Sequence, residues 1–175
     1  MRDLAQDLRA VLQAFDGRAT TLLGEAEAAF GEEPAYPDTL IALVGDRQPM
    51  VGSGATWLLK SYFERGGALS TEQTQALIKA LPKAEETHWS TQLHLCQSIR
   101  FLDFTANLST ALEAWLTPLL THKRPFVRAW SLDALAHLAK GQGQYRTNFE
   151  VALKRASEDE AASVRARARQ ILDGH

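Results

Sequence analysis

The sequence predicts an all-α protein built from stacked helix pairs. One stretch, residues 126–141 (FVRAWSLDALAHLAKG), places Val127, Leu135 and Leu138 at helical spacing. The same pattern occurs four times. Its first apolar residues, used below as reference positions, follow one another at intervals of 38, 38 and 37 residues and are Val51, Trp89, Val127 and Val164. A second apolar stripe precedes each recurrence, so each unit contains two helices joined by a short turn. Because one pair cannot bury its apolar stripe alone, this period indicates a right-handed α-solenoid of about five antiparallel pairs.

Residues 1–35 predict a divergent helix pair that caps one end of the stack. The first helix is expected over residues 1–15 and ends at Asp16-Gly17. Its apolar stripe consists of Leu4, Leu8, Val11, Leu12 and Phe15. The second helix is expected over about residues 18–30. The loop GEEPAYPD follows, because its two prolines disfavour a continued helix.

Four repeat units follow, at residues 36–67, 70–104, 107–141 and 144–173. Eight residues before the reference positions stand Leu43, Leu81, Leu119 and Ala156. Eleven residues before them stand Leu40, Ile78, Leu116 and Leu153. Ser70 and Gln73 predict a capping box at the start of the second unit. The helix over residues 163–172 closes the stack, and its RARAR run suits an outer face in water.

Composition places the chain among ordinary globular proteins. It has 175 residues, 45% hydrophobic and 23% charged, with a net charge of −2. Residues 1–90 carry 8 Lys/Arg and 13 Asp/Glu, a net −5, and residues 91–175 carry 11 and 8, a net +3. The single cysteine, Cys96, excludes a disulfide framework and fits a buried helical position. The N-terminus lacks the apolar run of a signal peptide, and no stretch is long enough to cross a bilayer, so we expect a cytoplasmic chain without membrane contact.

Two segments resemble the second helix of HEAT repeats. They are VRAWSLDAL, which begins at Val127, and SVRARARQIL, which begins at Ser163. Both keep a Val-Arg pair followed by a small residue four positions after the valine. The first two units have Val51-Gly52 and Trp89-Ser90 instead. The resemblance covers about residues 36–172. It implies a HEAT-like solenoid, a form shared by scaffolds, transport receptors, small adaptors and a few DNA glycosylases.

In HEAT-like stacks the second helices line a concave surface, and helical geometry predicts which of their residues face outward. We expect a strip that binds a protein or peptide, with Trp57 as its main anchor. The candidate partner-binding residues are Trp57, Lys60, Glu64, Leu95, Ser98, Leu102, Trp130, Asp133 and Lys140. The alternative is that Trp57 and Leu95 pack between neighbouring units.

No catalytic, cofactor or metal site is predicted. GSGAT at residues 52–56 lacks the Lys-Ser/Thr of a phosphate loop and lies in a helical pattern. The five histidines offer no HExxH motif and no i, i+4 pair. Trp130 and Asp133, near Arg128, have the residue types of a base-excising site. The alternative is that Arg128 pairs with an acid of a neighbouring unit.

The sequence therefore predicts a non-enzymatic protein-binding module or scaffold. The alternative is a HEAT-like protein that binds nucleic acid or excises DNA bases, using the basic residues of the C-terminal half to hold phosphates. Those residues fall on several faces and are interrupted by Glu158, Asp159 and Glu160, as in a solvated surface. A further alternative is a regulatory subunit that works inside a larger assembly.

Overall fold

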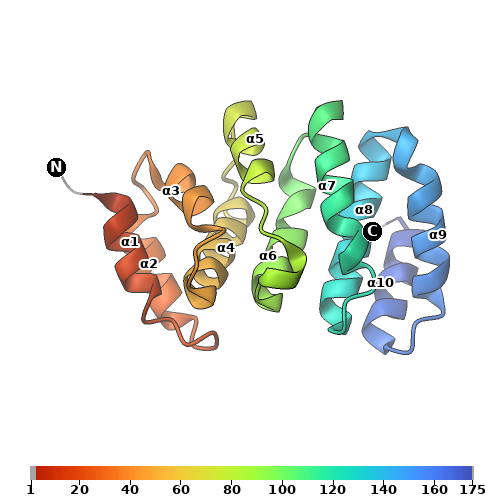
Figure 1. Ribbon diagram of the computed structural model, residues 1–175, viewed down its shortest axis with the longest axis horizontal. Coiled ribbons are helices and arrows are strands. Elements are labelled where there is room, and N and C mark those ends of the chain that lie inside the picture. Colours follow the sequence, from red (N-terminus) through yellow and green to blue (C-terminus); the bar gives the residue numbers. More distant parts are fainter. Residues whose placement is uncertain (1–2, 175) are drawn as a thin grey trace. The chain divides into compact units, whose positions relative to one another are not determined.

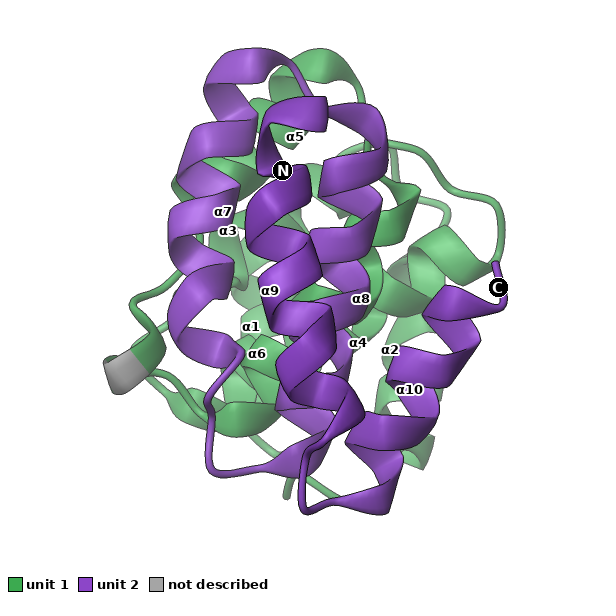
Figure 2. Ribbon diagram, turned by 90° about the vertical axis from the view of Figure 1, so that its right-hand side faces the viewer, with its two compact units in different colours: residues 1–102 green, residues 103–175 purple. Residues whose placement is uncertain are grey.

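The computed structural model describes residues 3–174, apart from the side chain of Glu85. Within these residues it contains ten α-helices and no strand, so the all-α prediction is confirmed. The chain divides into two compact units, residues 1–102 and residues 103–175 (Figure 2). No helix among the described residues is both long and apolar enough to span a bilayer.

The first unit contains six α-helices in the part of the chain that is described (Figure 1). They are α1 (Leu4–Leu12), α2 (Thr21–Phe30), α3 (Tyr36–Leu43), α4 (Pro49–Glu64), α5 (Thr71–Lys79) and α6 (Trp89–Ser98). Two single-turn 3-10 helices accompany them, η1 (Ala84–Glu86) before α6 and η2 (Ile99–Phe101) after it.

Local chemistry sets the ends of these helices. The Asp3 carboxylate accepts the first backbone N–H groups of α1, and Pro49 begins α4, where its missing N–H costs nothing. The predicted capping box is present at α5: Ser70 Oγ accepts from the Gln73 N–H, and Gln73 Oε1 accepts from the Ser70 N–H. After α4 the chain turns at Gly66, whose φ of 90° favours glycine.

The core of the first unit centres on α4. This helix packs against α3 and α6, while α1 contacts α2, α3 and α4. Its residues Val51, Ala55, Leu58 and Leu59 are fully buried. Burying one such branched side chain contributes roughly 1.5–3 kcal/mol. The predicted phosphate-loop lookalike, residues 52–56, lies inside α4, and Cys96 is buried in α6 as expected.

The second unit is organised around α8. Its helices are α7 (Ala106–Leu119), α8 (Pro125–Gly141), α9 (Arg146–Ser157) and α10 (Ala162–Leu172), with the 3-10 helix η3 (Gly143–Tyr145) before α9. Helix α8 contacts each of the other three α-helices, and α9 also contacts α10. Ala129 and Leu132 of α8 join Ala156, Val164 and Ala168 in one buried cluster.

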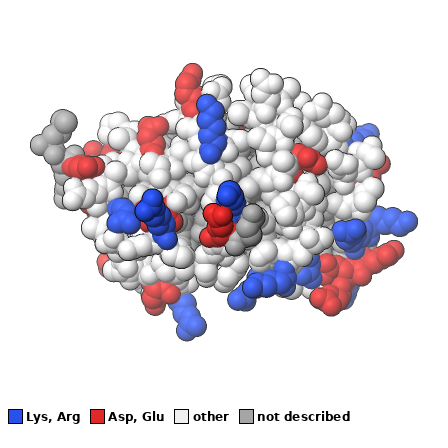
Figure 3. Space-filling view, in the orientation of Figure 1, with Lys and Arg blue, Asp and Glu red and all other residues white. Residues whose placement is uncertain are grey.

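Each predicted repeat range contains two consecutive α-helices of the structure, except that α7 begins one residue before its range, at Ala106. The pairs are α3–α4, α5–α6, α7–α8 and α9–α10. Charged side chains of both signs are interspersed over the surface that Figure 3 presents. That surface therefore carries no single large charged patch among the described residues. The candidates for a functional site are the loops and helix faces of each unit.

Candidate functional site

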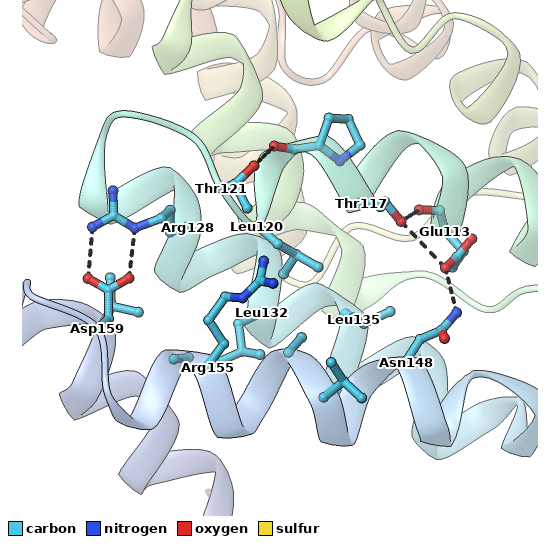
Figure 4. Close-up of a pocket in the computed structure, with 15 residues that line it drawn as sticks. Glu113, Thr117, Leu120, Thr121, Arg128, Leu132, Leu135, Asn148, Arg155 and Asp159 are labelled. Carbon is cyan, nitrogen blue, oxygen red and sulfur yellow. Dashed lines mark hydrogen bonds and ion pairs between the residues drawn. The ribbon is translucent and has the colours of Figure 1, made fainter.

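The main candidate site is a pocket of about 490 Å³ in the second unit. It lies between α7 and α9, with α8 as its floor, and its volume falls in the range of ligand-binding pockets, roughly 300–1,000 Å³. Figure 4 shows apolar side chains along its middle and polar groups at its two ends. The lining residues are Glu113, Thr117, Pro118, Leu120, Thr121, Arg128, Leu132, Leu135, Asn148, Val151, Ala152, Arg155, Ala156, Asp159 and Val164.

Small residues on α9 leave this space open. Ala152 and Ala156 are four residues apart, so they lie on one face of α9, and both line the pocket. At the position of Ala156, the three other repeat units carry leucine. Leu119 of α7 is such a leucine, and it is 1% exposed. The missing side-chain volume on α9 is therefore the local cause of the pocket.

The middle of the pocket is apolar. Leu132 and Leu135 form its floor from α8, and Leu120 closes it from the end of α7 (Figure 4). Val151 of α9 stands at its edge with 63% of its surface exposed. Val151 therefore extends the apolar lining of the pocket to its exposed edge.

One end of the pocket is a carboxylate held by neutral groups. Glu113 Oε1 accepts a hydrogen bond of 2.9 Å from Asn148 Nδ2, which joins α7 to α9. Thr117 Oγ1 donates to the Glu113 carbonyl oxygen at 2.9 Å (Figure 4). No ion pair to Glu113 is formed within residues 3–174, so this end offers acceptor oxygens to a ligand.

The other end is built on an ion pair. Arg128 Nε and Nη2 donate to Asp159 Oδ2 and Oδ1 at 2.9 and 2.8 Å, and both side chains are largely buried. These hydrogen bonds lower the pKa of Asp159 and raise the pKa of Arg128. Arg128 Nη1 also donates to the His122 carbonyl oxygen. The Arg155 side chain extends across the pocket from α9 (Figure 4), and it forms no ion pair within the described chain.

A second hollow, of about 460 Å³, lies in the first unit between the α3–α4 turn and the segment from Ala80 to α6. Gly52 lines it at the position that Arg128 holds in the second unit, directly after the reference valine. A Cβ atom on Gly52 would lie 3.0 Å from the Val44 carbonyl oxygen, so any larger residue would crowd the end of α3. Ala84 occupies the position that corresponds to Asp159. The hollow therefore marks a place where the arginine–aspartate pair is missing.

The structure places the predicted first-unit strip partly inside the protein. Trp57 and Lys60 are half-buried, and Lys60 Nζ donates to both Glu64 carboxylate oxygens at 2.8 Å. The expected exposure of Ser98 and Leu102 is wrong, because they are only 1% and 3% exposed, and Leu95 is 2% exposed, in agreement with the alternative that it packs between neighbouring helix pairs.

Two physical reasons explain this burial. Helix α6 packs against α4, which leaves few of its side chains facing water. The helix ends at Ser98 and continues as η2, so the helical spacing used for Leu102 no longer applies. These three residues offer almost no surface to a partner.

In the second unit, the predicted residues Trp130 and Asp133 are joined through α10. The Arg167 guanidinium lies 3.9 Å from the centre of the Trp130 ring, and its Nη1 donates to Asp133 Oδ1 at 3.3 Å. Arg167 thus binds both residues and links α8 to α10. Lys140 is exposed in the last turn of α8. Arg128 binds Asp159, so the alternative that it pairs with an acid of a neighbouring repeat unit is confirmed.

Sequence reasoning missed most of the pocket. It singled out Arg128, and it considered Arg155 only among the basic residues of the C-terminal half; it did not single out Glu113, Asn148 or Val151, whose convergence depends on how α7 and α9 flank α8. The signal that was available is Ala156, the one small residue in an otherwise leucine position. Among the described residues, no cluster of three or more His, Cys, Asp or Glu side chains could hold a metal ion. Comparison of the chain with family models, with curated proteins and with solved structures finds no match.

Proposed function

We propose that this chain is a non-enzymatic protein-binding module of HEAT-like α-solenoid form, and that the second-unit pocket receives a helical segment of its partner. The observation that carries the proposal is an apolar pocket of about 490 Å³ between two helices, bordered by the exposed Val151. Recognition of an amphipathic helix in a groove uses such a surface. The pocket replaces the predicted second-helix strip as the main binding site.

The polar groups of the pocket define the chemistry of that helix. Arg155, which extends across the middle of the pocket (Figure 4), favours a partner carboxylate, and Glu113 at one end favours a donor such as lysine or arginine. Between them, Leu120 and Leu135 favour apolar side chains. The partner is therefore an amphipathic helix with an apolar stripe between an acidic and a basic residue.

Two features support the HEAT-like solenoid. Four helix pairs follow one another at the period read from the sequence. Arg128 follows a buried valine near the start of α8, the second helix of its pair. It binds Asp159 in the loop before α10, which is the second helix of the following pair. A solenoid that stacks such pairs uses its surfaces for partner binding.

A labelled model helix tests the site. The probe is a fluorescein-labelled amphipathic peptide with leucines at i, i+3, i+4 and i+7, a glutamate beyond one end and a lysine beyond the other. Ala156→Leu fills the pocket with the residue that the other units carry. We expect it to weaken binding in fluorescence anisotropy by about tenfold or more, equivalent to about 1.4 kcal/mol, and circular dichroism checks that the variant keeps its helices.

Ala114→Leu is the matched control, because Ala114 is exposed on α7 and does not line the pocket. It should bind the probe like the unaltered chain. Arg155→Glu should reverse the preference between the glutamate probe and one in which lysine replaces that glutamate. Equal weakening by Ala156→Leu and Ala114→Leu, or no effect of either, would rule out the pocket as the binding site.

A further inference from the structure

Three aspartates hold the same place before three helices. Each stands five residues before a buried residue near the start of its helix, and each carboxylate accepts the backbone N–H two residues later. They are Asp3, Asp46 and Asp159, and the N–H groups belong to Ala5, Gln48 and Ala161 at 3.1, 2.8 and 2.8 Å. These bonds fix the orientation of each carboxylate and leave it room to accept another donor.

Three arginines also hold a common place, directly after the buried residue that stands fifth in the count from the aspartate position. They are Arg9, Arg128 and Arg165. Arg128 and Arg165 each donate Nη1 to the carbonyl oxygens five and six residues earlier. These bonds use one edge of each guanidinium. The remaining edge, formed by Nε and Nη2, faces a second partner in a fixed direction.

Two of the arginines bind an aspartate through that remaining edge in the same way. Arg9 Nε and Nη2 donate to Asp46 Oδ2 and Oδ1 at 2.7 and 3.1 Å. Arg128 uses the same two nitrogens on the same two oxygens of Asp159, at 2.9 and 2.8 Å. In each case the arginine of one helix clamps the loop before a later helix. We call this two-bond contact a rung.

One arginine and one aspartate are left over. Within residues 3–174, Arg165 Nε and Nη2 donate to no side chain, although Nη1 is bound as in Arg128. Asp3 is exposed, and its hydrogen bonds in the described chain go to the N–H groups of Ala5 and Gln6. Each is therefore one half of a rung with the orientation already set.

We propose that a second copy of this chain completes the rung, with Arg165 of one copy bound to Asp3 of the next. Leu172 lies seven residues after Arg165, on the same face of α10, and is 65% exposed. On α1, Leu4 and Val11 are half-buried and share a face seven residues apart. Apolar contact between these faces accompanies the rung.

Charge favours this head-to-tail arrangement over contact between like ends. The first unit carries 9 Lys/Arg and 13 Asp/Glu, a net −4, and the second carries 10 and 8, a net +2. Opposite units attract and like units repel. Because a head-to-tail contact leaves a free half-rung at each end, assembly continues beyond a dimer unless the rotation closes a ring.

Sedimentation velocity at low salt, from about 10 μM to about 1 mM, tests the contact on the untagged chain, a range suited to weak association. The sedimentation coefficient should rise with concentration. Arg165→Asp and Asp3→Arg should each weaken association by about tenfold or more, because each places two like charges opposite one another in the contact. An equimolar mixture of the two variants should associate again, because Asp3 of one meets Arg165 of the other.

Arg169→Asp is the matched control, since Arg169 is an exposed arginine one turn further along α10 and outside the rung pattern. It should associate like the unaltered chain. Asp3→Asn keeps a helix cap and removes the charge, so it tests the contact even where Arg165→Asp loses helicity. A monomer at every concentration, or equal effects of Arg165→Asp and Arg169→Asp, would overturn the proposal.

Discussion

The contact between α4 and α6 in the first unit and the contact between α8 and α10 in the second use opposite chemistry, although the first unit also holds the charged Arg9–Asp46 rung. In the first unit, α4 and α6 meet through neutral groups: Ser53 Oγ lies 2.6 Å from Ser90 Oγ, and Thr56 Oγ1 lies 3.3 Å from His94 Nδ1. In the second unit, α8 is joined to the loop before α10 by Arg128–Asp159 and to α10 itself by Arg167, which binds Trp130 and Asp133. One contact is neutral and the other is charged.

This difference shows how one repeat pattern accommodates both a neutral and a charged contact between helices. Hydroxyl pairs require short side chains and a close approach of the two helices, which the small residues Gly52 and Ser53 allow. Arginine spans a longer gap and still fixes the geometry through two hydrogen bonds. In the second unit the Arg128–Asp159 pair holds the loop before α10 in place, and the small residues Ala152 and Ala156 leave a pocket beside α9.

Breaking the charged contact should have the largest effect. Arg128→Ala removes the partner of Asp159, whose side chain is 13% exposed, and leaves a nearly buried carboxylate without its main donor. We expect the free energy of unfolding to fall by about 3 kcal/mol, near the lower limit for a broken buried pair. Urea unfolding followed by circular dichroism measures it. Arg169→Ala, an exposed arginine in the same unit, should change stability little; equal losses in both variants would contradict the comparison.

Acid should weaken the neutral contact first. Burial lowers the pKa of His94 to about 4 from its usual 6.5, so the folded chain keeps the ring neutral while the unfolded chain takes up a proton. The stabilisation is complete above pH 6.5 and is lost as the pH falls from 6.5 towards 4. The total loss is about 3 kcal/mol, spread over that window.

The measurement is urea unfolding at several pH values, with His94→Gln as the control. Burial also lowers the pKa of His122 in the second unit, so the unaltered chain and His94→Gln both lose stability in acid through His122. The difference between their unfolding free energies at each pH therefore isolates the contribution of His94. A slope between pH 6.5 and 4 that is identical in both proteins would show that His94 is not shifted. The rung carboxylates Asp46 and Asp159 act at lower pH. Their pKa values are lowered, so their stabilisation is lost only below about pH 4.

Removing a hydroxyl from the neutral contact should have a moderate effect. Ser53→Ala deletes one side of the 2.6 Å contact with Ser90, and Ser90 retains its hydrogen bond to His88 Nδ1. The expected loss is about 1 kcal/mol, typical of one hydrogen bond. A double-mutant cycle with Ser90→Ala measures the coupling by thermal unfolding. Strict additivity of the two substitutions would mean that the hydroxyls do not interact.

The smallest effect is expected on the surface of α4. Lys60 and Glu64 form an i, i+4 pair, and Glu64 is 43% exposed. Lys60→Ala should cost only about 0.3–0.5 kcal/mol, and the loss should disappear in 1 M salt. A loss comparable with that of Arg128→Ala, measured in the same urea series, would mean that exposure does not separate the two pairs.

Much of the fold follows from local rules that the sequence carries directly. The proline at the start of α8 and the capping box at Ser70 act within one turn, and the period of about 38 residues shows where the helical pattern recurs, so together they locate the helices without tertiary knowledge. The aspartate partner of Arg128 was anticipated only as an acid in a neighbouring unit. Its identity depends on how the loop before α10 turns back.

The candidate site was harder to predict because it depends on the space between helices. Helical spacing alone gave Leu95 and Ser98 an exposed face, but contact between α4 and α6 and the end of α6 decide their burial. The pocket exists because Ala156 is small where neighbouring units have leucine. Alignment of the repeat units shows that Ala156 is smaller than its equivalents. The positions of α7 and α9 in the structure are needed to see that this small residue leaves a pocket.

Methyl NMR of the chain titrated with the amphipathic probe peptide tests the central claim most directly. We expect saturable shifts of the Val151, Leu120 and Leu135 methyl groups, which line the second-unit pocket, and no change at Leu58 or Leu59 in the core of the first unit. Shifts confined to the first unit, or none at Val151 when the peptide is bound, would contradict the account.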